Sequence, residues 1–435
     1  MNILDIIAKK RDGIHLNKQE IEYFITQYTD GIVTDYQAAA LVMAIYINGM
    51  EYEEITNLTI AMSNSGDKID LSSIGKCVID KHSTGGVGDK ITIILSPIIA
   101  ALGIPVAKMS GRGLGFTGGT ADKLESIPGY QTEISEEKFI ENVRNIGISL
   151  ISQTKSIAPA DKKIYALRDA ISCTDSIPLI ASSIMSKKIA SGADKIVLDV
   201  TVGSGAFMKT NEEAIELSNT MINIGKLSSK ETICILTNMD EPLGYSIGNN
   251  LEVIEAIKCL KGEIPDDIKE VILELGSYMI KLSDNTKSIE EAKKMILETI
   301  YNGKAFEKFV QLVENQNGDI KYLYNTQLFE KAKNILPVYS KKNGYIEKID
   351  AKEIGKMSCN LGAGRTKKED TIDSTAGIVL NKKVGDSIKK NEILAYIHSN
   401  DLEKSELIVK ELENTISISD KKVKKMNTII KVLKD

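Results

Sequence analysis

The sequence predicts an α/β protein in three parts, and three observations carry this prediction. Residues 1–65 alternate apolar and polar positions at helical spacing, which predicts a domain built from helices. From residue 77 to about residue 335, short apolar runs alternate with helix-like stretches, which predicts a mostly parallel sheet covered by helices. After about Leu336 the runs are short and alternating, with frequent glycines, which predicts a β-rich C-terminal domain.

The N-terminal segment carries two helix-start patterns. Asn17 followed by Glu20 is typical of a helix start. Thr34 with Gln37 forms a capping-box pattern directly before the apolar run 38–47. These patterns predict several helices in residues 1–65.

The middle of the chain alternates between the two kinds of element. The predicted strands are residues 77–79, 105–107, 195–200 and 232–236. The predicted helices between them include residues 91–102, 136–146 and 212–224. A helical, polar-rich stretch at 159–188 interrupts this alternation, so it is not expected to belong to the sheet domain.

Composition excludes several classes of protein. The net charge of −5 over 435 residues lacks the basic footprint of a nucleic-acid-binding protein. The five cysteines are scattered and form no C-x-x-C pair, which indicates reduced thiols. Residues 1–13 do not resemble a signal peptide, and no apolar run approaches the roughly 20 residues that span a bilayer. We therefore expect a cytoplasmic protein with neither nucleic acid nor membrane as a partner.

A Gly-rich loop, DKHSTGGVGD at residues 80–89, predicts an anion site. Lys81 and the hydroxyls of Ser83 and Thr84 precede three glycines, and a predicted helix follows. Glycines let backbone N–H groups point at a ligand, and a helix N-terminus adds partial positive charge. The pattern lacks the G-x-x-x-x-G-K-[ST] order of an ATP-binding loop, so the ligand indicated is phosphate and not ATP. A lone loop of this kind could equally be a turn.

A second Gly-rich stretch, MSGRGLGFTGGTADKLESIP at residues 109–128, supports the ligand interpretation. It follows the apolar run 104–107, so it lies at the carboxyl end of a predicted strand, where open α/β sheets bind their ligands. Two such loops, both with hydroxyls and cations, favour a ligand over two unrelated turns.

These two motifs resemble the signature of the thymidine and pyrimidine-nucleoside phosphorylases. The likeness continues through SQTKSIAPADKKIYALRD, DSIPLIASSIMSKKIASGADKIVLDV and VGSGAFM, and it runs over most of the chain. It implies a helical domain like that of anthranilate phosphoribosyltransferase, to which the 159–188 stretch returns. The implied division is a discontinuous helical domain of residues 1–65 and 159–190, an α/β domain of residues 70–155 and 191–335, and a C-terminal domain of residues 336–435.

The resemblance implies a homodimeric pentosyltransferase that uses phosphate to release the base from uridine, thymidine and deoxyuridine, with no organic cofactor. Two other enzymes remain open. One is a thymidine phosphorylase restricted to 2′-deoxynucleosides. The other is an anthranilate-type phosphoribosyltransferase, which would need an acidic Mg²⁺ site that neither loop shows. A carrier or scaffold protein built around residues 340–400 is the non-enzymatic alternative.

The resemblance also assigns residues to the two substrates. Those implied for phosphate are Lys81, His82, Ser83, Thr92, Lys108, Ser110 and Thr120. Those implied for the pyrimidine are Arg168, Ser183 and Lys187. Ser183 and Lys187 are four apart on a predicted helix and share one face, and Arg168 offers a planar fork of donors suited to a carbonyl oxygen.

Three of these residues are expected to act in catalysis: His82, Arg168 and Lys187. With an unperturbed pKa near 6.5, a protonated His82 is suited to donate a proton to the carbonyl oxygen of the departing base. Arg168 and Lys187 would stabilise the negative charge that develops there.

The resemblance further implies a potassium ion near the hinge, with ligands from Gly88, Lys90, Leu243, Ser246 and Glu255. Two residues depart from the family pattern: Lys90 stands where a threonine is usual, and Phe116 where a histidine is frequent. An ammonium group at this position would compete with the ion, and Phe116 is expected to alter the sugar or base pocket.

Residues 377–397, GIVLNKKVGDSIKKNEILAYI, resemble half of a biotinyl or lipoyl carrier barrel, with its turn at Gly385 and Asp386. Carrier domains present a modified lysine at this turn, and none stands here. We therefore expect a structural β-rich domain without a covalent prosthetic group.

Overall fold

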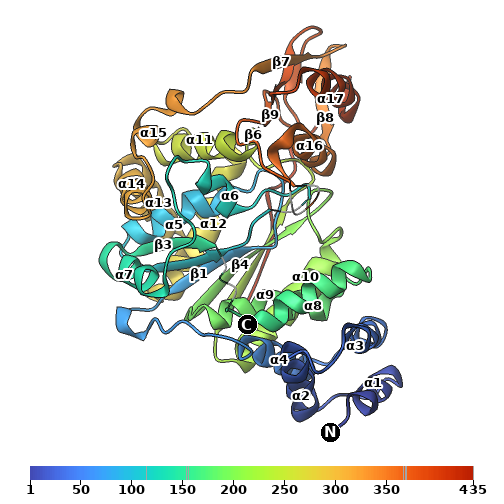
Figure 1. The fold of residues 1–435 in the computed structure, drawn as a ribbon. Coiled ribbons are helices and arrows are strands. Elements are labelled where there is room, and N and C mark those ends of the chain that lie inside the picture. The colour runs from blue at the N-terminus through green and yellow to red at the C-terminus, as the bar shows by residue number, and fades with distance from the viewer. Residues whose placement is uncertain (114, 153, 155, 366, 368–369, 435) are drawn as a thin grey trace.

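A computed structural model of the chain describes residues 1–434 except 114, 153, 155, 366, 368 and 369, and it has three parts. Figure 1 shows the N-terminal helices at one end, a sheet flanked by helices in the middle, and the orange-to-red C-terminal domain at the other end. The predicted fold class is confirmed.

The helical domain is made of two segments that are far apart in the sequence. Its helices are α1 (Ile3–Arg11), α2 (Lys18–Thr29), α3 (Asp35–Asn48), α4 (Tyr52–Ser63), α8 (Pro159–Ala170) and α9 (Ile177–Ala190). Side chains of α8 and α9, including Ile164 and Leu179, share one apolar core with those of α1 to α4. The helical domain is therefore discontinuous, as the sequence predicts.

Capping explains where two of these helices begin. Asn17 is the N-cap of α2, its side chain accepts from the Glu20 backbone N–H, and the Glu20 carboxylate accepts in return. The Gln37 side chain accepts from the Thr34 backbone N–H at 3.2 Å at the start of α3. Such boxes satisfy backbone donors that a helix start leaves free, and both predicted starts are confirmed.

The large domain is built on a parallel sheet. Strands β1 (Ile79–Ser83), β4 (Lys195–Val202) and β5 (Glu231–Asn238) pair side by side in parallel. Strands β2 (Val106–Ser110) and β3 (Ile148–Ser152) form a second parallel pair. This pair lies beside β1, where the Ile79 N–H donates to the Pro105 carbonyl at 3.3 Å.

Helices cover this sheet and bury a large apolar core. They are α5 (Ile91–Ala101), α6 (Thr120–Glu125), α7 (Glu136–Ile146), α10 (Asn211–Leu227), α11 (Asn249–Leu260), α12 (Asp266–Ser283), α13 (Ile289–Tyr301), α14 (Lys304–Asn315) and α15 (Lys321–Tyr324). The core on the α5 side runs from β1 through α5, α12 and α14. On the other face, α4 and α9 of the helical domain pack against α10.

Two strands differ from the sequence prediction in a way that bears on function. β1 was expected at 77–79 and β2 at 105–107, but both run on to include buried lysines, Lys81 and Lys108. A lysine is tolerated inside a sheet only when a charge partner is buried with it. The partners are Asp199 and Asp80.

The C-terminal domain consists of two small sheets and two helices. Its elements are β7 (Asn334–Tyr339), β8 (Gly344–Ile349), α16 (Ala351–Ser358), β9 (Gly377–Leu380), β10 (Ser387–Ile388), β11 (Ile393–Ser399), α17 (Leu402–Thr415) and β12 (Ile416–Ser419). One sheet has the order β10-β8-β12 and the other β6-β9-β11-β7. The predicted turn at Gly385 lies just before β10, with φ of 90°. The likeness to a carrier barrel stays a prediction.

Strands are exchanged between the large and the C-terminal domains. β6 (Ser246–Ile247) belongs to the middle of the chain but pairs with β9. β13 (Ile429–Leu433), which the sequence places with residues 336–435, pairs antiparallel with β5 at the edge of the central sheet. The two domains are therefore connected by strand pairing at two places, at β9 in the middle of the C-terminal segment and at β13 near its end.

The order of the strands marks a place for a ligand. From β1 the chain moves outward in one direction to β2 and β3, and then returns to β4 and β5 on the other side of β1. In open α/β sheets, ligands bind at the carboxyl ends of the strands where this direction reverses. In this chain that point lies between β1 and β4, directly beside the first Gly-rich loop.

Within the part of the chain that the structure describes, no helix combines the length and the apolar character needed to cross a membrane. All five cysteines are free; Cys77 is half-buried and the other four are buried.

Candidate active site

Strand β1 carries the centre of the site, and its alternation sorts polar side chains onto two faces. Successive residues of a strand point to opposite faces. Lys81 and Ser83 therefore share one face, and Asp80 and His82 share the other. All four belong to the segment that the sequence singles out.

On the first face Lys81 lies deep in the sheet. Its Nζ is 3.3 Å from Asp199 Oδ2 on β4, and both side chains are buried. Among the described residues, Lys81 Nζ has no partner with hydrogen-bond geometry, whereas Asp199 also accepts from Thr237 Oγ1 at 2.7 Å. A buried ammonium group with unused donors is a ready partner for an anion.

On the second face one carboxylate holds two lysines. Asp80 is buried, with Lys188 Nζ at 2.7 Å and Lys108 Nζ at 3.5 Å from its two oxygens. Lys188 lies on α9 of the helical domain, and its Nζ also donates to the Met109 carbonyl at 3.4 Å. This cluster therefore joins the helical domain to the ends of β1 and β2.

Positive charge surrounds His82. Burial lowers the pKa of His82 well below its ordinary value, and the ammonium groups of Lys188, Lys108, Lys187 and Lys81 lower it further. A protonated His82 was expected from the sequence, and this expectation is wrong for the structure: the imidazole is neutral near pH 7. Since lysines of both domains act on one ring, the potential there favours an anion.

One member of the lysine cluster, Lys108, has a lowered pKa. Burial lowers the pKa of Lys108 from its ordinary value, and although Asp80 opposes this, Lys188 and Lys81 lower it again. A bound anion would relieve this repulsion.

The other residues predicted for phosphate lie at the ends of β1 and β2 and at the starts of α5 and α6. Ser83 Oγ accepts from the Gly85 N–H at 3.1 Å, which shapes the first Gly-rich loop. Thr92 is buried in the first turn of α5, directly after this loop. Ser110 ends β2, and Thr120 begins α6, on either side of the second loop. The structure thus places the predicted phosphate residues along two neighbouring loops.

The helical domain contributes a second cluster. Lys187 Nζ donates to Ser183 Oγ at 2.8 Å, so the predicted i, i+4 relation on α9 is confirmed. Lys187 also pairs with Asp161 Oδ2 of α8 at 2.6 Å and remains about one fifth exposed. Asp161 was not among the predicted residues; it fixes the position of the Lys187 ammonium group.

Arg168 donates to backbone carbonyls of its own domain in this structure. Its side chain is buried, and its three guanidinium nitrogens donate to the carbonyls of Cys173, Thr174 and Leu179 at 2.7 to 3.1 Å. These carbonyls belong to the connection between α8 and α9 and to the start of α9. In this arrangement Arg168 holds the backbone that carries Ser183 and Lys187, and its contact with the base stays a prediction.

Three of the residues predicted to hold potassium surround the side chain of a fourth, Lys90. Lys90 Nζ donates to the carbonyls of Leu243 and Ser246 at 2.9 and 3.0 Å and to Glu255 Oε2 at 2.6 Å. Burial would lower the pKa of Lys90, but the carboxylates of Glu255 and Glu252 outweigh burial and raise it. The Lys90 ammonium group already lies among these oxygens, and its positive charge would repel a second cation, so these residues do not fit a bound potassium ion.

Phe116 lines a small pocket together with Gly88 of the first Gly-rich loop. Its side chain packs, partly buried, against the core of the C-terminal domain, beside Gly355 of α16. The expected effect of Phe116 on the sugar or base pocket stays a prediction.

Sequence reasoning missed several residues of the site. Asp80, Asp199 and Lys188 are buried partners of predicted residues, and Lys123 Nζ joins the Asp89 carbonyl at 2.7 Å to Glu252 at 2.7 Å. The only local signal was a charged residue in an otherwise apolar run, as Asp199 is in KIVLDV.

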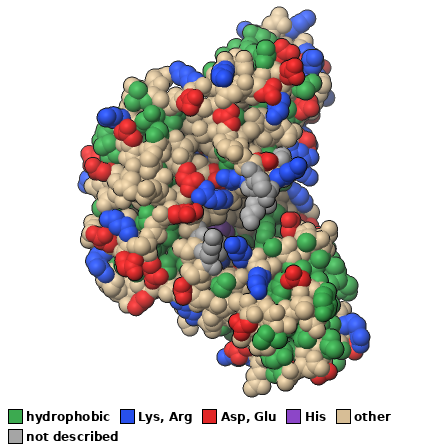
Figure 2. Space-filling view, viewed as in Figure 1, with side chains coloured by type: hydrophobic (Ala, Val, Ile, Leu, Met, Phe, Trp, Pro, Cys, Tyr) green, Lys and Arg blue, Asp and Glu red, His purple; other side chains and the backbone are tan. Residues whose placement is uncertain are grey.

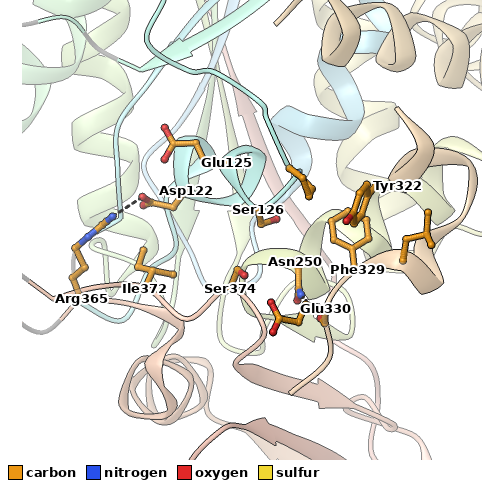
Figure 3. Close-up of a pocket in the computed structure, with 12 residues that line it drawn as sticks. Asp122, Glu125, Ser126, Asn250, Tyr322, Phe329, Glu330, Arg365, Ile372 and Ser374 are labelled. Atoms are coloured by element: carbon orange, nitrogen blue, oxygen red, sulfur yellow. Dashed lines mark hydrogen bonds and ion pairs between the residues drawn. The ribbon is translucent and has the colours of Figure 1, made fainter. Parts of the chain in front are cut away.

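A cavity of about 480 Å³ lies elsewhere, between α6, α11 and the C-terminal segment. Figure 3 shows Asp122 of α6 paired with Arg365 across it, at 2.9 Å. Among the described residues its lining contains Asp122, Glu125 and Glu330 but only one cation, Arg365, and none of the predicted substrate residues. Three carboxylates make this cavity unfavourable for phosphate.

Figure 2 shows a separate hollow between the helical domain and the rest of the molecule. Blue, red and purple side chains gather inside it, which identifies it as a place where charged groups and a histidine face solvent. The lysine cluster, with members from both domains, and this hollow together define the candidate active site.

Comparison with known proteins supports this assignment. Residues 75–306 match the family described as glycosyl transferase family, a/b domain, and residues 4–66 match its helical bundle domain. Residues 345–419 match the pyrimidine nucleoside phosphorylase C-terminal domain. The crystal structure of anthranilate phosphoribosyltransferase from Thermus thermophilus shares the fold, with a TM-score of 0.59 and 18% identity, over 72% of this chain and 99% of that one.

Curated relatives match almost the whole chain. The pyrimidine-nucleoside phosphorylase of Staphylococcus epidermidis is 52% identical over 97% of both chains. Those of Staphylococcus haemolyticus and Staphylococcus aureus are 52% identical over 96% and 50% identical over 97% of both chains. With this identity, and with the matched domains in the same order, the chain belongs to the pyrimidine-nucleoside phosphorylase family of pentosyltransferases.

Proposed function

We propose that this chain catalyses the reversible phosphorolysis of pyrimidine nucleosides. Phosphate attacks C1′, the bond from C1′ to the base nitrogen breaks, and the products are free base and ribose or deoxyribose 1-phosphate. We infer that uridine, thymidine and deoxyuridine are all substrates. The observation that carries the proposal is the cluster of lysines from two domains around one neutral histidine.

Phosphate would bind at the end of β1. Lys81 offers a buried ammonium group that is ion-paired with Asp199 but makes no hydrogen bond of good geometry to the described residues, and Ser83 and Thr92 offer hydroxyls beside it. Lys108 lies across the strand with a lowered pKa, which a dianion would raise again. Phosphate itself supplies the nucleophilic oxygen, so the reaction needs no organic cofactor.

The base would face the helical domain. The leaving pyrimidine takes the electron pair of the broken bond, and its carbonyl oxygens become negative. Lys187, held by Asp161 and Ser183, would stabilise this charge more strongly than it binds the neutral nucleoside, which is how a contact accelerates a reaction. A neutral His82 can still donate an N–H hydrogen bond, while Arg168 positions the start of α9.

The test is release of free base from uridine, thymidine, deoxyuridine and cytidine in parallel, with and without phosphate. We expect phosphate-dependent release from the first three. A uridine rate below about one thousandth of the thymidine rate, roughly 4 kcal/mol of discrimination, would indicate the restricted thymidine phosphorylase. Transfer from a phosphoribosyl pyrophosphate, without phosphorolysis of any nucleoside, would indicate the phosphoribosyltransferase.

We propose further that two copies pair through the helical domain. Leu4, Tyr36 and Ile47 of the packed helices α1 and α3 are 57%, 75% and 71% exposed, and Figure 2 shows apolar side chains gathered over this domain. Exposed apolar groups in one patch are typical of an interface. Light scattering should give a dimer, and Ile47→Asp should give monomers; a monomeric wild type would refute this pairing.

We also propose that the protein works in the reducing environment of the cytoplasm, because its five cysteines are all free. Thiol titration of protein unfolded without reductant should find five thiols. A lower number would contradict this location.

A further inference from the structure

The ammonium group of Lys90 is enclosed by oxygen atoms. The side chain is fully buried, and its three donors meet three acceptors: the Leu243 carbonyl at 2.9 Å, the Ser246 carbonyl at 3.0 Å and Glu255 Oε2 at 2.6 Å. This is the full hydrogen-bonding capacity of a lysine. The site leaves no donor unused and carries one positive charge at its centre.

The surrounding loop is folded closely around this group. Gly244 has a φ of +70°, and a Cβ there would lie 2.9 Å from Lys90 Nζ and 2.7 Å from Glu255 Oε2. Glu255 also accepts from the backbone N–H groups of Tyr245 and Ser246 at 2.9 and 3.0 Å. The carboxylate thus binds the loop directly and through the ammonium group.

Lys90 joins two parts of the molecule. It is the residue before α5 and directly follows the first Gly-rich loop. The loop that contains Leu243, whose carbonyl accepts from Lys90 Nζ, leads into β6, and β6 pairs with the C-terminal sheet. A single cation at this point therefore fixes the phosphate loop against the segment that connects to the C-terminal domain.

The oxygens around Lys90 Nζ are those that the family resemblance assigns to a potassium ion. We propose that in this chain the Lys90 ammonium group takes the place of a bound monovalent cation, so that the two loops are held without K⁺ or Na⁺. A second cation in the same enclosure would be repelled at close range. The inference concerns the stability of the fold, so it can fail while the proposed function holds.

The first test uses the wild-type protein. Its melting temperature is measured in potassium, sodium and choline chloride at equal ionic strength. We expect the three curves to coincide within about 1 °C, because a ligand stabilises only a protein that binds it. A saturable rise in potassium over choline would overturn the proposal, whether or not any variant folds.

The second test removes the ammonium group. Lys90→Thr leaves the carbonyls and Glu255 without a cation, so the variant should be less stable in choline chloride. It should regain about 2 °C or more as potassium is added, with a saturable dependence. A variant that folds only in potassium would support the proposal equally, whereas Lys90→Thr without any specific response to potassium would refute it.

A matched control contacts the same loop from the C-terminal domain. Lys383 is also buried, donates to the carbonyls of Pro242 and Gly244, and pairs with Asp267 at 2.9 Å. Lys383→Thr should lose stability that potassium does not restore beyond choline. An equal response of both variants to potassium would show a general effect of the salt and would count against the proposal.

Discussion

Lys81 and Lys187 approach the site from different domains, and their loss should have different kinetic consequences. Lys81→Ala removes a charged donor from phosphate, so the phosphate KM should rise about 10- to 150-fold, the equivalent of 1.5 to 3 kcal/mol. Lys187→Ala removes stabilisation of the departing base, so kcat should fall about a hundred- to a thousandfold. Initial rates with both substrates varied would separate the two effects.

Lys195→Ala is the matched control, because this lysine lies at the start of β4, pairs with Glu231 at 2.9 Å and is partly exposed. It should leave both constants unchanged. If Lys187→Ala keeps the wild-type kcat with uridine and thymidine, Lys187 does not act on the leaving group.

Arg168 should behave as a positioning residue. Arg168→Ala would leave three backbone carbonyls without their donor, and a buried group left unpaired costs about 1 to 3 kcal/mol. We expect a loss of about 3 kcal/mol in the free energy of unfolding, measured with urea, together with a lower kcat. Lys187→Ala should show the lower kcat with little loss of stability.

Arg168→Lys provides the second comparison. One ammonium group cannot reach three carbonyls in the way a planar fork does, so this variant should also be less stable. Wild-type stability in Arg168→Ala, together with a lower kcat, would instead favour the direct contact with the base that the sequence predicts.

The neutral state of His82 should make the fold sensitive to acid. Its pKa in the folded protein is lowered by burial and by four lysines, whereas in the unfolded chain it is about 6.5. Below pH 6.5 the unfolded chain binds a proton that the folded protein does not. The free energy of unfolding should therefore fall by up to about 1.4 kcal/mol per pH unit from pH 6.5 down to the folded pKa.

Urea titrations at several pH values would measure this slope, and His82→Gln should reduce it. His398→Gln is the comparison: burial alone lowers the pKa of His398, so this variant should reduce the slope as well, without a contribution from lysines. Phosphate should raise the pKa of His82 in an NMR titration, because it neutralises the charge that lowers it. A His82 signal that titrates near pH 6.5 without phosphate would contradict the assigned environment.

At the scale of elements, the sequence predicts those helix boundaries that are determined by contacts between residues close together in the chain. The starts of α2 and α3 follow from side chains that cap their own helix, and α7 has the predicted bounds of 136–146. The polar ends of β1 and β2 could not be predicted, because the partners of Lys81 and Lys108 are brought by other strands. For the same reason the family resemblance named Leu243, Ser246 and Glu255 but not the hydrogen bonds that Lys90 makes to them.

β13 is the element whose position was least accessible to sequence reasoning. It returns from the C-terminal domain to β5, where Ile429 and Val432 pack against the large core and Leu433 against the α10 side. Removing residues 428–435 should expose the edge of β5 and cost about 3 kcal/mol, from three half-buried apolar side chains and the lost pairing. Urea unfolding would measure this loss.

A variant that keeps the strand isolates the effect of packing. Ile430→Ala changes a more exposed residue of β13 and should have little effect. If the shortened chain is as stable as the full one, the pairing of β13 with β5 contributes nothing to the fold.

At the scale of the whole molecule, the site is divided between two bodies. The phosphate residues lie on the sheet domain and Ser183 and Lys187 on the helical domain, so catalysis requires the two to meet. The connecting segments near residues 66–73 and 151–159 lie side by side, with the Asp67 N–H donating to the Ser156 carbonyl at 2.9 Å; residues 153 and 155 lie outside the described part. A Cβ on Gly66 would stand 2.0 Å from that carbonyl oxygen, so the chain has no room for a side chain there.

Lys188 connects the helical domain to the sheet domain by an ion pair. It lies on α9 yet pairs with Asp80 of β1 at 2.7 Å, close to where phosphate would bind. Phosphate and free uracil together, which cannot react, should draw the domains closer. The radius of gyration measured by X-ray scattering should therefore fall when both are added.

Lys188→Met should weaken this closure, because it removes the cation that bridges the domains next to the bound anion. Lys163→Met is the matched control: Lys163 lies on α8 and donates to the carbonyls of Tyr28 and Thr29 within the helical domain, so its loss should leave the closure intact. Identical angles between the domains in ligand-free and liganded crystals would show instead that the site is already assembled before its substrates arrive. In that case the lysine cluster would act by its charge alone, without any movement of the helical domain.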